Sequence, residues 1–128
     1  MTPFVMWDED NKVEVKSVED IKILMDQIFN ISQGELPISI EMYLDEQKSM
    51  YIVIGSNRSP VGFICNADNP LMLGAYSSHL EGAGYFTFNH RGHYSVVQME
   101  YTIPVDDAKM ALLHFFETGN PKDGIVWQ

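Results

Sequence analysis

Hydrophobic residues recur at helical spacing in an early stretch of the chain. The stripe consists of Ile21, Leu24, Met25 and Ile28. Spacings of three and four residues place these side chains on one face of a helix. Ser17 before the stripe is a suitable N-cap, and Gly34 after it is a natural stop. We therefore predict a helix over residues 18–32.

A second helical stripe lies near the carboxyl end. Its members are Ala108, Ala111, Leu112, Phe115 and Phe116. Pro104 suits the first helical turn, Gly119 ends the pattern, and Pro121 prevents its continuation. After this helix, residues 125–127 (Ile-Val-Trp) are expected to form a short strand or a packed tail.

Between the two helices, the period of the hydrophobic pattern changes to two. Apolar and polar residues alternate over 38–45, which is typical of a half-buried strand. Further strands are expected at 49–54 and 61–65, with a loop at 55–60, so that these three strands form an antiparallel meander. Before the first helix, residues 3–7 are extended in character and 12–16 alternate like an edge strand.

The region after the meander contains a less regular segment and then a hairpin. Residues 66–84 hold one proline and three glycines and show no clear period. Strands are expected at 85–89 and 93–103, joined by a turn in which Gly92 takes a positive φ. Together these elements predict a single α+β domain over 1–128: an antiparallel sheet, meander plus hairpin, with two main helices packed on one face.

Composition indicates a cytoplasmic protein. Cys65 is the only cysteine, so no internal disulfide can form. The first residues lack a basic start followed by an apolar segment, and no apolar run is long enough for a membrane span.

The net charge of the chain indicates which classes of molecule it can bind. Eight Lys and Arg stand against 18 Asp and Glu, a formal net charge of −10. Such a protein repels nucleic acids and anionic membranes at long range, and it attracts a basic protein. Neither nucleic acid nor a membrane is expected as a direct partner. The alternative explanation is that the acidic residues serve only to keep the protein soluble.

The sequence carries no specific catalytic motif. It has no GxGxxG, GxxxxGK[ST], GxSxG, HExxH or CxxC pattern. His90 and His93 flank a predicted turn without a third ligand at a defined spacing, and nothing in the sequence pairs Cys65 with His79. The pairs of adjacent acidic residues lie at predicted helix starts and turns, where capping and solvation explain them without a catalytic role. We therefore expect a non-enzymatic protein without a metal or cofactor.

The carboxyl-terminal quarter resembles a known family. The matching residues are Ile103-Pro104, Ala108, Ala111, Phe115-Phe116, Thr118-Gly119, Pro121 and Ile125-Val126-Trp127. In this order they resemble the ending of the first immunity-protein family of bacterial polymorphic toxin systems, which includes inhibitors of deaminase toxins. The resemblance is close over about 25 residues, from Ile103 to Trp127, in which Pro104 and Pro121 mark the two ends of the predicted helix. Over the rest of the chain it is loose. It implies an immunity protein that binds a cognate toxin domain and blocks its active site, and that has no catalytic residue of its own. The net charge of −10 suits this task if the toxin is basic.

Three segments are candidates for the partner-binding surface, because binding loops sit on rigid scaffolds. They are the irregular segment 66–84, the hairpin tip at 89–93, and the acidic turn after the first meander strand. Tyrosine and arginine are frequent anchors at interfaces. The candidate residues are Asp45, Glu46, Asp68, Tyr76, His79, Glu81, Tyr85, His90 and Arg91.

Two other functions remain as alternatives. The first is a small metal-binding or hydrolytic enzyme that uses His79, His90, His93 and nearby carboxylates. The second is a structural interaction module, for example a homodimer formed through an exposed sheet edge.

Overall fold

A computed structural model describes all residues, 1–128, and has the expected α+β architecture. The helices are α1 (Val18–Ser32) and α2 (Val105–Thr118), with short 3₁₀ turns η1 (Ser78–Leu80) and η2 (Met99–Tyr101). The strands are β1 (Phe4–Trp7), β2 (Asn11–Glu14), β3 (Ile38–Tyr43), β4 (Lys48–Ile54), β5 (Arg58–Ser59), β6 (Val61–Cys65), β7 (Leu71–Gly74), β8 (Tyr85–His90), β9 (His93–Gln98) and β10 (Ile103–Pro104).

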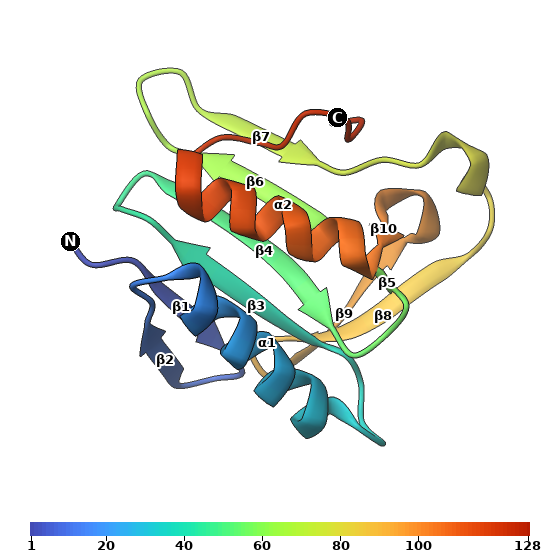
Figure 1. Cartoon of the computed structure of the whole chain (residues 1–128). Helices are drawn as coiled ribbons and strands as arrows, with labels where there is room; N and C mark the ends of the chain where they lie inside the picture. The colour runs from blue at the N-terminus through green and yellow to red at the C-terminus, as the bar shows by residue number, and fades with distance from the viewer.

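The central sheet has the strand order β2-β1-β3-β4-β6-β7, with antiparallel pairing throughout. Both helices cover one face of this sheet, as Figure 1 shows. The main core of 20 buried residues lies between the helices and this face. Phe63 of β6 and Phe115 of α2 meet there edge to face, with ring centroids 5.8 Å apart. The predicted fold class, including both helices on one face, is confirmed.

The helix ends follow the local signals in the sequence. The Ser17 hydroxyl accepts a hydrogen bond from the Asp20 N–H, which satisfies one of the free donors at the start of α1. Pro104 is the N-cap of α2 instead of lying inside the first turn. Gly119 ends α2 with a left-handed φ of 74°, a conformation that costs glycine little.

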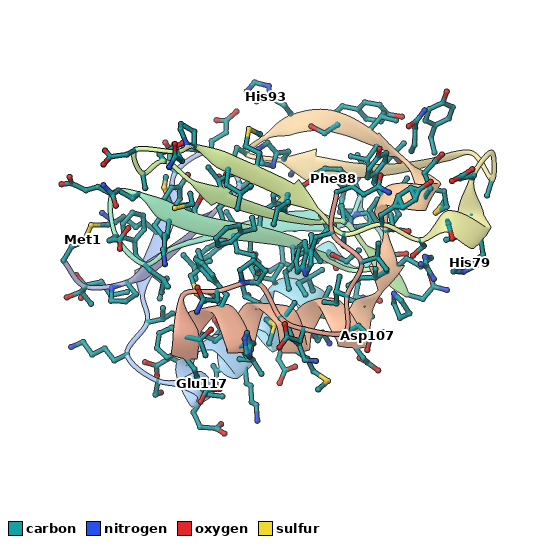
Figure 2. The ribbon with its side chains drawn as sticks, turned by 90° about the horizontal axis from the view of Figure 1, so that it is seen from above. Met1, His79, Phe88, His93, Asp107 and Glu117 are labelled. Atoms are coloured by element: carbon teal, nitrogen blue, oxygen red, sulfur yellow. The ribbon has the colours of Figure 1, made fainter.

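The β8–β9 hairpin forms a third layer on the face of the sheet opposite the helices (Figure 2). It joins the sheet where Asn89 pairs in parallel with Ile38 of β3. Phe86 and Phe88 point back toward the sheet and bury Val53 of β4 in a small second core. The hairpin turn has positive φ at both Arg91 and Gly92, which matches the type I′ geometry favoured between twisted strands.

Three local expectations were wrong. Residues 66–84 contain the strand β7, which pairs with β6 from Cys65↔Leu71 to Gly62↔Gly74. The expected long strand 93–103 stops at Gln98, and the chain turns through η2 before β10. The loop 55–60 contains β5, which pairs with β10. Of these elements, β5 and β10 pair across more than 40 residues, which local pattern could not reveal. Strand β7 and the turn η2 are instead closed by near neighbours in sequence.

The carboxyl-terminal tail packs against the sheet edge, as the sequence predicted. Gly74 and Gln128 exchange two backbone hydrogen bonds, of 2.7 and 2.9 Å. The Trp127 indole donates a hydrogen bond to the Lys122 carbonyl. No helix in the structure combines the length and the apolar character needed to cross a membrane.

Candidate protein-binding site

One face of the β8–β9 hairpin points into solvent. Cross-strand pairing puts the aromatic pair Phe86 and Phe88 on the inner face, so the alternate residues point outward. We call this surface the outer hairpin face; it consists of Tyr85, Thr87, Asn89, Tyr94, Val96 and Gln98. Tyr85 is 67% exposed, Tyr94 71% and Val96 47%. Six residues without a charge, two of them exposed tyrosines, form an unusual surface on a protein of net charge −10, and they match the composition of protein interfaces.

The same hairpin presents an unpaired sheet edge. β9 pairs only with β8. The two-residue turn makes His90↔His93 a hydrogen-bonded pair, so the backbone groups of Tyr94, Val96 and Gln98 point away from β8. This edge carries no proline, bulge or charged side chain, the devices that usually protect edge strands. The other hairpin edge strand in the sheet, β2, does carry charges at Lys12 and Glu14.

A polar cluster holds the hairpin tip against the back of the sheet. The Glu41 carboxylate lies at its centre: its Oε1 is 3.5 Å from Arg91 Nε and 3.8 Å from His90 Nε2. The Tyr43 hydroxyl donates to Glu41 Oε2 at 2.9 Å. Oε1 is buried and has no hydrogen-bond partner, and the Arg91 guanidinium balances its charge. Two predicted contact residues, His90 and Arg91, thus have a structural role in fixing the hairpin.

Burial and the Glu41 charge affect the neighbouring tyrosines. The pKa of Tyr43 is raised, first by burial and then by the hydrogen bond and charge of Glu41. The pKa of Tyr51 is also raised, mainly by burial and to a smaller extent by the charge of Glu41. Tyr51 also packs beside Phe88 and His90, so both tyrosines remain neutral in the interface between sheet and hairpin.

The cluster superficially contains a nucleophile, a base and an acid. Ser39 Oγ lies 2.8 Å from His90 Nδ1, and Glu41 follows on the other side of the imidazole. Ser39, however, is only 1% exposed. A substrate carbonyl could not reach its hydroxyl, so this arrangement orients the histidine and does not form a nucleophilic site.

Three of the four acidic candidates lie at one end of the sheet. Asp45 and Glu46 belong to the β3–β4 turn, and Asp68 belongs to the β6–β7 loop. A hydrogen bond from the Asn66 N–H to the Gln47 carbonyl brings these two segments together. The backbone N–H groups of Gln47 and Lys48 lower the pKa of Asp45, which shows that this carboxylate closes the turn.

Tyr76 and Glu81 lie at a different corner, around η1. The Tyr76 hydroxyl donates to the Glu81 carboxylate, and this contact raises the pKa of Tyr76 to about 12. The Tyr76 ring also packs edge to face against Tyr101. Tyr85 follows η1 at the base of the hairpin. The nine predicted contact residues therefore occupy three places and form no single surface.

The structure brings together only two histidines of the enzyme alternative: His90 and His93 pair across the hairpin, while His79 lies elsewhere. His79 and His93 lie in separate parts of the molecule in Figure 2. His79 follows the end of β7 that is opposite Cys65, so these two residues form no pair either. No group of three or more His, Cys, Asp or Glu side chains is arranged to hold a metal ion.

Sequence reasoning missed Tyr94 and Val96. Their alternation with Ser95 and Val97 was visible, but alternation does not tell which set points outward. The decisive signal was on the partner strand, where Phe86 and Phe88 form the more apolar set and pair across from Val97 and Ser95.

Comparisons with known proteins assign no class to this site. The chain matches no model of a known protein family and no curated protein.

Proposed function

We propose that this chain is a non-catalytic immunity protein that binds a basic bacterial toxin domain through the outer hairpin face and blocks the toxin's active site. The observation that carries the binding role is the uncharged, tyrosine-containing outer face beside an unpaired strand edge. Exposed tyrosines contribute large contact area and a hydrogen-bonding hydroxyl, which makes them common anchors of interfaces.

Two further observations support a toxin as the partner. The residues from Ile103 to Trp127 resemble the ending of the immunity-protein family, and in this chain they form β10, α2 and the docked tail. The net charge of −10 favours fast association with a basic, nucleic-acid-acting domain.

The test is co-expression with a toxin domain encoded immediately upstream of this chain. The proposal expects rescue of growth and co-purification of the two proteins. Tyr94→Ala should weaken the complex by about tenfold to a hundredfold, as loss of an anchoring tyrosine does. Met110→Ala is the control, because Met110 is exposed on α2, on the other side of the sheet. If the chain does not rescue growth and does not co-purify with the toxin domain, the immunity role is refuted.

A separate measurement tests whether charge attracts the basic toxin domain to this acidic chain. Affinity for the toxin domain is measured at increasing salt concentration, where screening should weaken a charge-steered complex. Affinity that stays constant with salt would remove this part of the proposal and leave the binding role intact.

A further inference from the structure

An apolar groove runs beside the free edge of β9. Its cavity has a volume of about 430 Å³. The lining extends from β9 across β6 to β7. It includes Tyr51, Gly62, Ile64, Met72, Val97 and Gln98. None of the residues that line the groove has a charged side chain.

The sheet forms the floor of this groove through two rows of paired residues. One row runs Tyr51–Gly62–Gly74, and the other consists of Ile64 and Met72. Because Gly62 has no side chain, the Tyr51 ring lies directly against the backbone of β6, where a Cβ would overlap it. Met72 is 75% exposed at the far side of the floor. The floor of the groove therefore includes two residues without side chains, and apolar side chains border it.

The unpaired backbone groups and the groove are neighbours. Val97 points inward from β9 and lines the groove, while the N–H and C=O groups of Tyr94, Val96 and Gln98 point along the plane of the hairpin. A strand hydrogen-bonded to these groups would lie about 5 Å from β9, over β6 and β7. Every second side chain of that strand would point at the groove floor.

We propose that this groove binds an extended, uncharged segment of the partner protein, which adds a strand to β9 and buries its alternate apolar side chains over Gly62, Ile64 and Met72. The inference rests on the proposed binding function and names how the partner is held. Main-chain hydrogen bonds would supply affinity and the groove would supply specificity, as in other cases of strand addition.

The occupant is a segment of another protein and not a second copy of this chain. Two β9 strands paired antiparallel are related by a two-fold axis perpendicular to the hairpin. That operation places the second copy's sheet on the same side as the first, in the space that β6 and β7 already fill. The absence of charged side chains along the groove fits an apolar segment, because a buried charge without a partner is costly.

The experiment uses the full chain and a random peptide library displayed on phage, with inserts of about ten residues, enough to span β9. Phage are selected on the chain and counter-selected on Val96→Pro, which removes one outward N–H at a position where an edge strand tolerates proline. A peptide synthesised from the enriched sequences is then titrated. Circular dichroism verifies that each variant is folded.

We expect enriched sequences with apolar residues at every second position and without acids. The peptide should slow amide hydrogen exchange at Tyr94, Val96 and Gln98. Val96→Pro and Met72→Glu should each weaken its binding at least about tenfold. Met110→Glu, at a matched exposed methionine on α2, should bind it like the original chain.

Three results would overturn the inference. They are a library that yields no enriched sequence, peptide binding without protection of the β9 amides, and protection of those amides by self-association of the chain alone. The toxin experiment separates the two proposals. Rescue that survives both Val96→Pro and Met72→Glu would refute the groove while the immunity role stands. Peptide binding without any rescue would refute the immunity role alone.

Discussion

At the scale of single residues, Gly62 shows how a missing side chain shapes a surface. Its φ is not in the left-handed region, so backbone strain does not require glycine there. Glycine is required because a Cβ would overlap the Tyr51 ring, which is itself packed beside Phe88 and His90. Gly74, the next residue in the same row, has only ordinary contacts around its Cβ position.

Gly62→Ala is therefore expected to lower the free energy of unfolding by about 1–3 kcal/mol, the usual cost of overpacking. Gly74→Ala is the matched control and should change it by less than about 0.5 kcal/mol. Urea denaturation gives both values. In a Tyr51→Ala background the cost of Gly62→Ala should vanish, since the ring it displaces is absent. Equal costs for the two glycines would contradict the steric explanation.

At the scale of elements, the hairpin and the helical layer are held by separate apolar clusters. The hairpin depends on Phe86 and Phe88 packed on Val53 and on the polar cluster around Glu41. The helices depend on the larger core, which includes Phe115. Elements with few buried contacts open locally at lower free energy than the rest of a domain. The candidate interface is thus supported by the weaker of the two clusters.

Phe88→Ala should loosen the hairpin without unfolding the helical layer. We expect amide exchange to accelerate over β8 and β9, while the amides of α1 remain protected. Phe115→Ala, at an equally buried position in the main core, should instead cost about 3–5 kcal/mol and accelerate exchange throughout the domain. Hydrogen exchange followed by mass spectrometry distinguishes the two patterns. Uniform acceleration in Phe88→Ala would mean that hairpin and core unfold together.

At the scale of the whole molecule, the tyrosines couple stability to alkaline pH. The pKa values of Tyr43 and Tyr51 are raised above the ordinary value of 10.0. Because their pKa values are raised in the folded state, the two protonated tyrosines make their full contribution to the free energy of unfolding at pH values below 10.0. This contribution is lost as the pH rises through the folded-state pKa, because the unfolded chain releases these protons first.

The free energy of unfolding should therefore fall over the range of pH that begins near the ordinary value of 10.0 and extends above it. Urea midpoints across this range measure the loss. Tyr51→Phe cannot ionise and should lose less stability over the same interval, whereas its stability near neutral pH should stay within about 1 kcal/mol of the original. An identical alkaline loss in Tyr51→Phe would show that Tyr51 does not contribute to it.

The sequence by itself determined the two helices, the meander and the position of the hairpin turn. These features depend on interactions between near neighbours: the spacing of Ile21 and Leu24, the cap at Ser17, and the positive φ at Gly92. The fold class followed from their order along the chain.

Only the tertiary structure decided where the candidate site lies. Parallel pairing of Asn89 with Ile38 and burial of Phe86 and Phe88 on Val53 place the hairpin on the back of the sheet. That placement turns Tyr94 and Val96 outward and opens the groove over β6 and β7. Alternation along one strand specifies two faces but not which one is buried, because that choice depends on residues more than 30 positions away.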